Sequence, residues 1–581
     1  MSASRMAARL SASLRSRTAE RPLSTAARPP HPLAPQRPGG VGARGAPRPK
    51  QQWSTLTAIL LATLTGTATY AVGLSSGRGA STSDNKVMAQ ASGTDRERFK
   101  KALEEVRGWM PPEFVSVDRD DLISHGYSDW IPHDPHGLPG AVLYPRSTED
   151  VVKIVKLASK YGIPLIPYCA GTSLEGHAGA MEYASDTKTG RITALPEQSA
   201  PRTVDQLEAG LAWTLDFAEN MNQIIAIHPD DLDIVVQPGI SYDAINEELK
   251  DKGIPLFFPI DPAPGAQIGG MCGTGASGTN AVKYGTMRDN VLNLTVVLAN
   301  GEVIKTRQRA KKSSAGPDLG KLFIGSEGTL GIITEITLKL APRLPTTVAV
   351  SSFPNIEAAA AAARDLVQQG ISLACIELMD DVMVKAINKA NSSDGRRTWP
   401  EKPSLFLKFA GNEGQMKSDI DRTRKITNAN QGSNFTFAKN ESEADDIWHS
   451  RKIALWSAID YVPGSKCWTT DVCVPISNFP TLIAESRADF DSEGITGPIV
   501  SHAGDGNYHA LLLFRNLEER NKVDKLVHRM VERAQRLDGT CTGEHGVGYG
   551  KMPFIENELG PGTIEILRKF KEALDPQNIM T

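Results

Sequence analysis

Hydrophobic positions between residues 141 and 167 alternate between the periodicity of strands and that of a helix. Ala141–Tyr144 and Ile163–Pro167 are short apolar runs, which favours strands. The apolar positions between them follow the spacing of one helix face: Val151, Ile154, Val155 and Ala158. Ser147 suits the N-cap of this helix and Gly162 its C-terminal stop. The stretch therefore predicts a strand–helix–strand unit.

The same arrangement recurs near residue 240. Ile234–Gln237 is a predicted strand, Ser241 can cap the helix that follows, and Gly253 can end it. Further strands are predicted at Val291–Leu298, Val303–Thr306 and Ile332–Leu340. In the last strand we expect outward side chains at every second position, namely Glu335, Thr337 and Lys339. Helices and strands with short connections predict a domain that mixes both.

The composition changes near Leu344, where we place a domain boundary. Asn355–Gln369 is predicted as an alanine-rich helix and Glu441–Ser457 as a second helix. Two strands are predicted in this half: Leu405–Phe409 and Thr470–Val474. One long apolar stripe at helical spacing ends before Gly539 and consists of Val523, Leu526, Val527, Met530, Ala534 and Leu537. We interpret that stripe as a packing face.

Three loops rich in small residues are candidates for binding a phosphorylated cofactor. They are Ile166–His177, Gly265–Gly285 and Phe323–Thr334. Glycines let backbone amides approach a diphosphate closely, and the hydroxyls of Thr172 and Ser173 add donors. One such loop after a strand is usually only a turn, so the prediction depends on all three occurring together.

His502-Ala-Gly-Asp-Gly-Asn-Tyr-His509 is a candidate metal site. Asp505-Gly506 is a preferred two-residue hairpin turn. If the turn closes there, the two histidines lie opposite each other on one face and can hold one divalent metal. A hairpin with two uncoordinated histidines is the alternative. Glu544 and His545, set among glycines, offer a third ligand and a base.

The three loops together resemble the FAD-binding domain of the vanillyl-alcohol-oxidase-type (PCMH-type) flavoproteins. The matching runs are Pro167-Tyr-Cys-Ala-Gly-Thr-Ser-Leu-Glu-Gly-His177, Pro264-Gly-Ala-Gln-Ile-Gly-Gly-Met-Cys-Gly-Thr-Gly-Ala-Ser-Gly278 and Ile324-Gly-Ser-Glu-Gly-Thr-Leu-Gly-Ile-Ile-Thr334. The resemblance implies an α+β fold. A two-subdomain FAD-binding domain is expected at 96–343. A substrate or cap domain of the FAD-linked oxidase C-terminal type, with an antiparallel sheet, is expected at 344–581.

The resemblance also implies which residues bind the cofactor, the metal and the substrate. Its expected FAD contacts are Pro167, Ala170, Gly171, Thr172, Ser173, Leu174, Pro264, Gly270, Thr274, Gly275, Ser277, Gly278 and Ile332. The expected ligands of a divalent metal, zinc or manganese, are His502, His509 and Glu544. His545 matches a general base, and Arg451 matches an arginine that binds the substrate carboxylate. A histidyl bond to the flavin is conceivable at His177, although the resemblance implies non-covalent FAD.

These roles are chemically consistent with oxidation of a 2-hydroxy acid. A metal on the substrate hydroxyl lowers its pKa, and a neutral histidine can then take the proton. A guanidinium suits the substrate carboxylate, although Arg451 could simply be a helix-surface residue.

The chain is most similar to the D-2-hydroxy acid dehydrogenases of this family. The resemblance implies oxidation of D-lactate with electrons passed to cytochrome c. Relatives that act on 2-hydroxyglutarate carry a lysine where Thr469 stands, which favours a substrate with one carboxylate. Dehydrogenation of D-2-hydroxyglutarate or glycolate by the same fold is an alternative, as is a non-enzymatic, membrane-tethered binding protein.

Composition agrees with a globular enzyme. The 581 residues are 40% hydrophobic and 23% charged, with a net charge of −3, which gives no indication of nucleic-acid binding. The six cysteines include no Cys-x-x-Cys pair, so a disulfide scaffold and a zinc ribbon are excluded, and single buried thiols are expected.

The N-terminal residues differ from the rest of the chain. Residues 1–50 are rich in Arg, Ser, Ala and Pro, which is typical of a mitochondrial transit peptide. Residues 51–77 carry no charge and are long enough to cross a bilayer, or to serve as a sorting segment, and 78–95 reads as a tether. The flanking charges predict an inner-membrane anchor with the catalytic part in the intermembrane space. Residues 182–210 have no clear period, and we interpret them either as a surface insertion or as a mistranslated segment.

Overall fold

The computed structural model describes residues 93–128, 130–132, 137–179, 183–185, 192–194 and 207–581. The predicted transit peptide, the 51–77 segment and most of the tether lie outside these residues, and so does most of the 182–210 segment. Within the described part, no helix combines the length and the apolar character that crossing a membrane requires.

The first sheet has four strands in the order β1-β2-β6-β3. Their bounds are Val115–Ser116, Ala141–Leu143, Trp213–Asp216 and Leu165–Tyr168. β2 and β3 both run parallel to β6, and helix α5 (Thr148–Tyr161) connects β2 to β3. As predicted, Ser147 caps this helix and Gly162, with φ 64°, ends it. Its apolar face packs with helix α3 (Gly93–Arg107) in one core.

The free edge of this sheet is completed by the end of the chain. β3 is an edge strand, and Leu165 forms a parallel bridge with Met580. The amide of Leu165 donates to the Ile579 carbonyl at 2.7 Å, and Thr581 donates back to the Leu165 carbonyl at 3.1 Å. Residues 579–581 come after the large C-terminal domain in the sequence, and they pair with β3, the strand that leads into the first glycine-rich loop.

The second sheet has five strands in the order β11-β10-β12-β8-β7, all antiparallel. Their bounds are Val303–Lys305, Val291–Val297, Ile332–Lys339, Asp233–Val236 and Ile224–His228. The expectation that Thr337 points outward is wrong. It is buried in the central strand, where its hydroxyl donates to Asn293 Oδ1 at 3.0 Å, because a threonine can enter an interior when its hydroxyl finds a partner.

Short elements link these two sheets and shape the glycine-rich loops. Helix α6 (Tyr242–Asp251) is capped by Ser241, as predicted. The remaining short helices are α4 (Arg119–Gly126), α7 (Ile268–Thr274), α8 (Ala281–Tyr284), α9 (Met287–Asn290), α10 (Leu319–Phe323), η2 (Pro112–Phe114) and η4 (Pro229–Asp231). Two small antiparallel pairs are β4 (Tyr183–Ser185) with β5 (Ile192–Ala194), and β9 (Leu256–Phe257) with β13 (Ala341–Pro342).

The third sheet has eight antiparallel strands, in the order β17-β14-β16-β15-β20-β21-β18, with β19 also paired to β21. In that order the bounds are Ser433–Phe437, Thr346–Ser352, Ser404–Ala410, Leu373–Met379, Ile499–His502, Asn507–Phe514, Lys466–Thr469 and, for β19, Val472–Cys473. The predicted strand Thr470–Val474 is therefore shorter: only Val472 and Cys473 form β19, although the Thr470 amide still donates to the Ala510 carbonyl of β21 at 3.0 Å.

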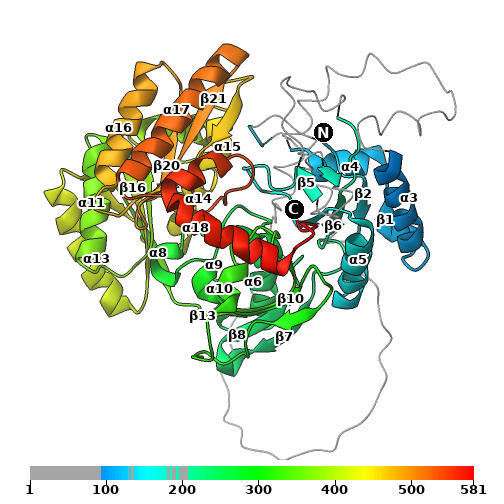
Figure 1. Cartoon of the computed structure of the whole chain (residues 1–581). Coiled ribbons are helices and arrows are strands. Elements are labelled where there is room, and N and C mark those ends of the chain that lie inside the picture. Colours follow the sequence, from blue (N-terminus) through cyan, green and yellow to red (C-terminus); the bar gives the residue numbers. More distant parts are fainter. Residues whose placement is uncertain (1–92, 129, 133–136, 180–182, 186–191, 195–206) are drawn as a thin grey trace, which may run out of the picture. The chain divides into compact units, whose positions relative to one another are not determined.

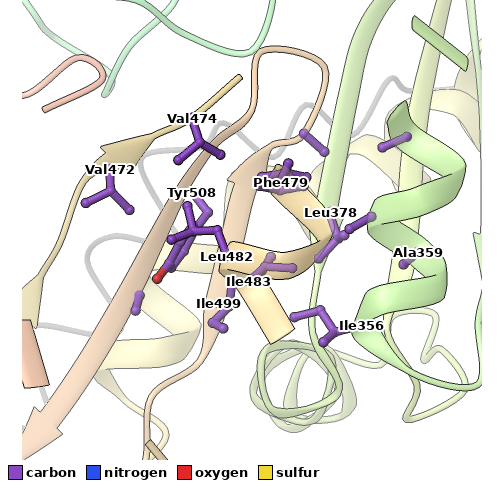
Figure 2. Packing of buried hydrophobic residues seen from close by; sticks show 14 of the residues in the cluster. Ile356, Ala359, Leu378, Val472, Val474, Phe479, Leu482, Ile483, Ile499 and Tyr508 are labelled. Carbon is purple, nitrogen blue, oxygen red and sulfur yellow. The ribbon is translucent and has the colours of Figure 1, made fainter. Parts of the chain in front are cut away.

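Helices cover both faces of this large sheet. One face packs against α11 (Ile356–Gln368), α13 (Glu413–Ala429), α16 (Phe479–Ser492) and α17 (Leu517–Arg536) (Figure 1). Figure 2 shows Ala359 of α11 and Leu482 of α16 within this packing. The stripe predicted from Val523 to Leu537 is this packing face of α17. The other face packs against α12 (Asp381–Ser393), α14 (Glu441–Lys452) and α15 (Ala454–Ile459). The single helix predicted over Glu441–Ser457 is thus two helices that meet at Ile453.

The last helix of the described residues is α18 (Met552–Leu574), which carries an interruption at Gly560 (φ 75°, ψ 159°) just before Pro561. All six cysteines are free thiols, and Cys272, Cys375 and Cys541 are buried while the other three are partly exposed. The expectation of single thiols is confirmed, although burial is complete for only half of them.

Candidate active site

The two histidines of the predicted metal site lie on the face of the large sheet that α12, α14 and α15 cover. His502 follows Val500 by two residues and His509 precedes Leu511 by two, and both of these apolar residues belong to that face. Glu544 approaches from the loop after α17. Its Oε1 lies 3.2 Å from His502 Nε2 and 3.1 Å from His509 Nε2.

The predicted two-residue turn between the histidines is wrong. Residues 503–506 form a longer loop, so that His502 pairs with Asn507 and His509 pairs with Val500. The register differs from the expected one by an even number of residues, which leaves both side chains on one face. They are diagonal neighbours whose ring centroids lie 5.4 Å apart.

The ligand atoms of His502, His509 and Glu544 all lie within 4.8 Å of one another, which suits one metal ion. The second ring nitrogens are engaged elsewhere. His502 Nδ1 lies 3.0 Å from Glu377 Oε1, and His509 Nδ1 lies 3.0 Å from the Thr470 carbonyl. Both Nδ1 atoms therefore act as donors, and both Nε2 atoms are left as potential ligands. Glu544 Oε2 is buried and has no hydrogen-bond partner in the described part of the chain.

The electrostatics favour positive charge at this point. Burial disfavours a charged imidazole, but the Glu377 and Glu544 carboxylates raise the pKa of His502 well above its ordinary value. Burial likewise opposes ionisation of Glu544, and the neighbouring His502 outweighs it and holds the pKa of Glu544 well below the usual range. A proton or a metal cation can supply the charge that these groups stabilise.

Arg451 reaches the same place from α14. Its Nε lies 2.7 Å from Glu377 Oε2, and Glu377 is fully buried on β15. The described residues offer no second hydrogen bond to this guanidinium, so its terminal nitrogens are left for an anion. The other oxygen of Glu377 accepts from His502. Glu377 therefore contacts both a predicted metal ligand, His502, and the predicted carboxylate-binding residue, Arg451.

His545 lies next to the three candidate ligands. Its ring stacks on that of His509 with centroids 4.9 Å apart and an angle of 11° between the planes. Its Nδ1 lies 3.6 Å from Glu175 Oε1, in the first glycine-rich loop. Burial disfavours the charged ring, and the Asp471 carboxylate outweighs it and raises the pKa of His545.

The loop that carries Glu544 and His545 is held by buried carboxylates. Asp471 Oδ2 accepts the backbone amides of Gly543, Glu544 and His545 at 2.7, 2.8 and 2.9 Å. Asp471 lies between β18 and β19, and it is buried. Further along the loop, Glu327 Oε2 accepts the Gly548 amide at 2.9 Å, and its Oε1 accepts the Val547 amide.

The three glycine-rich loops lie side by side, as the cofactor hypothesis requires. The Gly325 amide donates to the Cys272 carbonyl at 2.9 Å, so the third loop contacts the second. A Cβ added to Gly269 would lie 3.0 Å from Cys169 Sγ, so the second loop contacts the first. A Cβ on Gly328 would lie 2.2 Å from the Pro167 ring, so the third loop contacts the first.

The residues predicted to contact FAD are distributed over these loops and the elements beside them. Pro167 lies in β3, and the loop after it holds Ala170, Gly171, Thr172, Ser173 and Leu174. Gly270 and Thr274 lie in α7, which ends at Gly275 with φ 69°, and Pro264, Ser277 and Gly278 flank this helix. Ile332 begins β12 with its side chain buried in the core. His177 lies beside the third loop, with Nε2 3.1 Å from Glu327 Oε1.

Sequence reasoning missed several residues that organise this site. Glu377, Asp471, Glu175, Glu327 and Lys551 are far apart in the sequence and lie in no shared pattern. One signal was present: Glu175 and Glu327 both interrupt glycine-rich loops in which the neighbouring residues are small. A charged residue in such a loop needs a partner when it is buried.

Comparison with known families agrees with this arrangement. Residues 345–581 match the model described as FAD linked oxidases, C-terminal domain. Residues 139–188 and 181–307 match the model of an FAD binding domain. The first match covers the large sheet and its helices, and the second covers the first two glycine-rich loops.

Individual proteins are similar over most of the chain. D-lactate dehydrogenase (cytochrome) of Kluyveromyces lactis, a mitochondrial protein, is 42% identical over 496 residues, which is 84% of this chain and 81% of the relative. D-lactate dehydrogenase (cytochrome) 1 of Saccharomyces cerevisiae, also mitochondrial, is 40% identical over 84% of this chain and 80% of the relative. The solved structure of 4-ethylphenol oxidase from Gulosibacter chungangensis superposes with a TM-score of 0.66 at 19% identity, covering 85% of this chain and 97% of that one, which supports the fold alone.

Proposed function

Since the chain belongs to the FAD-linked oxidases, in the branch of the mitochondrial cytochrome-type D-lactate dehydrogenases, we propose that it oxidises D-lactate to pyruvate and passes the electrons to cytochrome c. The observation that carries the proposal is a convergence. Two histidines, a glutamate and a base candidate meet beside an arginine, and the loop that bears two of them contacts two of the glycine-rich loops.

His502, His509 and Glu544 are the proposed ligands of a divalent metal. Both histidines present Nε2, and the buried Glu544 Oε2 needs a partner, so the residues fit a cation. Imidazole and carboxylate ligands suit zinc or manganese. The glycine-rich loops are the proposed site of FAD. A metal held by these residues would supply polarisation of the substrate hydroxyl, and FAD held by the loops would supply the acceptor for the C2 hydride.

The chain's own residues then have three tasks. The terminal nitrogens of Arg451 bind the substrate carboxylate and orient the molecule, and Glu377 holds the guanidinium through Nε. His545 takes the hydroxyl proton on Nε2, because its Nδ1 faces Glu175. His502, His509 and Glu377 are buried, and Arg451, Glu544 and His545 are only partly exposed, which limits water near the reacting atoms. Proton and hydride leave the same substrate, and pyruvate remains.

The substrate class follows from the cations at the site. Arg451 serves one carboxylate, and Thr469 provides no charge where a second would be needed. D-lactate is therefore favoured over D-2-hydroxyglutarate. The names of the relatives support the same choice, and they support cytochrome as the acceptor and the mitochondrion as the location. The inner-membrane anchor at 51–77, with the catalytic part in the intermembrane space, is proposed from the sequence pattern.

The visible spectrum of the purified protein tests the proposal. We expect bound flavin that D-lactate bleaches in the absence of an acceptor. The His545→Ala variant should keep the flavin colour. Its rate of bleaching by D-lactate should fall roughly 10²–10⁴-fold, because a positioned base contributes that much to the rate. A colourless protein would favour the binding-protein alternative.

Substrate preference needs a separate measurement. Steady-state rates with cytochrome c should be highest for D-lactate when D-lactate, glycolate and D-2-hydroxyglutarate are compared. A higher kcat/KM for the diacid would contradict the assigned substrate and leave the flavin chemistry intact.

A further inference from the structure

The loop from Gly543 to Lys551 carries both Glu544 and His545, and it is anchored at its far end by the first glycine-rich loop. Glu175 belongs to that glycine-rich loop and is only 3% exposed. Its main-chain carbonyl accepts the amides of Tyr549 at 2.9 Å and Gly550 at 3.0 Å. The two loops therefore join through the backbone, although some 370 residues of sequence separate them.

The glycines of the 543–551 loop, called the catalytic loop below, make this approach possible. Gly548 has φ +47°, and a Cβ there would lie 2.3 Å from the Glu175 carbonyl oxygen. Gly546 has φ +83°, and a Cβ there would lie 2.6 Å from Glu327 Oε1. Gly548 therefore permits contact with the first glycine-rich loop, and Gly546 permits contact with the third. The positions of these glycines thus reflect packing against a main-chain carbonyl at Gly548 and a carboxylate at Gly546, as well as backbone freedom.

The side chain of Glu175 adds a charged contact. Its Oε1 lies 3.2 Å from Lys551 Nζ and 3.6 Å from His545 Nδ1. Lys551 is buried, and its Nζ also donates to the Asp471 carbonyl at 3.0 Å. Burial opposes the ammonium charge, but Glu175 and Asp471 outweigh it and raise the pKa of Lys551.

Lys551 Nζ thus lies between two carboxylates, 3.6 Å from Asp471 Oδ2 and 3.2 Å from Glu175 Oε1. The Asp471 carboxylate accepts the amides at the beginning of the 543–551 loop, and the main-chain carbonyl of Glu175 accepts amides near its end. Because Asp471 lies in the C-terminal half and Glu175 in the FAD-binding half, the ammonium group fixes the loop relative to both. A buried pair of this kind is costly to break, because it leaves an uncompensated charge.

We propose that Glu175 is a positioning residue. Its carboxylate, through its contacts with Lys551 Nζ and His545 Nδ1, holds the 543–551 loop in place against the first glycine-rich loop. The inference rests on the proposed function for its kinetic consequence, since His545 must lie where it can take the substrate proton as C2 faces the flavin. Its structural content, the anchoring of the loop, is independent of which substrate is oxidised.

Glu175→Gln in the FAD-loaded protein is the principal test, because glutamine keeps the size and an acceptor and removes the charge. We expect the rate constant of flavin bleaching by D-lactate to fall roughly 10- to 100-fold, the effect of a small misplacement of a reacting group. KM should change much less, because Arg451 and the metal ligands are untouched. FAD and metal content per protein should stay the same.

A double-mutant cycle separates the Glu175–Lys551 contact from other effects. Lys551→Met should lower the same rate constant, and the double variant should be little slower than either single variant, because both remove one interaction. Asp380→Asn is the matched control. It also removes a buried carboxylate from an ion pair, with Arg487 at 3.3 Å. The other hydrogen bonds of Asp380 go to the amides of Met383 and Ile499, and none of these partners is a proposed ligand, base or substrate contact. We expect the control to lower Tm without altering the bleaching rate.

Hydrogen–deuterium exchange supplies a readout that needs no substrate. Peptides covering 543–551 should exchange faster in Glu175→Gln than in wild type, and those covering the Arg487–Asp380 pair should not. Unchanged exchange together with unchanged bleaching overturns the proposal, and so does loss of FAD from the variant, which would place Glu175 in cofactor binding. If D-lactate fails to bleach even the wild-type flavin, the assigned substrate is wrong, and the exchange result still decides the anchoring.

Discussion

Glu377 occupies a position where two functions depend on one side chain. One carboxylate oxygen accepts from His502 Nδ1 and the other from Arg451 Nε. Burial opposes its ionisation, yet His502 and Arg451 outweigh burial and lower the pKa of Glu377. We therefore propose that Glu377 couples metal ligation by His502 to substrate orientation by Arg451, although it contacts neither the metal nor the substrate in the proposed mechanism.

Replacement of Glu377 should affect both functions together. In Glu377→Gln we expect metal affinity to fall roughly 10- to 100-fold, as for other partners of ligating histidines. KM for D-lactate should rise as well, because Arg451 loses the group that orients it. Metal titration and steady-state kinetics measure the two effects.

A similar substitution elsewhere provides the control for Glu377. Glu335→Gln changes a partly buried glutamate of β12 that lies 3.5 Å from the Thr295 hydroxyl, in the FAD-binding half. Metal affinity and KM should remain at wild-type values in that variant. If Glu377→Gln behaves like Glu335→Gln, the coupling described here is wrong.

At the scale of elements, the catalytic loop depends on close backbone approach. Gly548→Ala would bring a methyl group against a main-chain oxygen of Glu175, which cannot rotate away as a side chain can. We expect flavin bleaching by D-lactate to slow by at least about 10-fold while FAD remains bound, because the loop carrying His545 must shift.

Gly253→Ala is the matched control for this substitution. Gly253 also has a positive φ, +66°, but a Cβ there meets nothing within 4 Å. Both alanines carry a backbone cost of about 1 kcal/mol for the left-handed conformation, so Tm should fall in both. Equal bleaching rates in the two variants would show that the steric contact at Gly548 does not affect the rate of flavin reduction.

The elements also show what the sequence could reveal. Helix caps at Ser147 and Ser241 and the stripe on α17 were predicted because each depends on neighbours a few residues away. The family resemblance is confirmed. It could be recognised in the sequence because its motifs are contiguous runs of residues. The hairpin register and the burial of Thr337 were mispredicted, because both depend on partners across a sheet. Glu377 and Glu175 were missed for the same reason: their contacts are long-range.

At the scale of the whole molecule, Glu327 joins the two halves. It lies in the third flavin loop and accepts amides of Val547 and Gly548 from the catalytic loop. Burial opposes its charge, but the contacts with His177 and with these amides lower the pKa of Glu327. A carboxylate whose pKa is lowered on folding stabilises the folded state above its unfolded pKa and loses that contribution as the pH falls through the folded value.

The pH dependence of stability tests this junction. Wild type should be more stable than Glu327→Gln at pH 7, and the difference should be fully present above about pH 4.5, the ordinary glutamate value. It should shrink as the pH falls below that value, because protonation removes the charge that glutamine already lacks. Urea midpoints at pH 7, 5 and 4 measure the difference, and a constant gap across this range would contradict the assignment.

The pairing of Leu165 with residues 579–581 constrains how the protein can be made. The strand beside the first flavin loop is translated early, but its outer edge stays open until more than four hundred further residues have emerged. A nascent chain therefore exposes an unpaired β-edge throughout synthesis of the cap domain, which is the kind of surface that chaperones protect and that aggregates otherwise. The first sheet of the flavin-binding half is therefore complete only after the cap domain has been synthesised, even though its own sequence comes first.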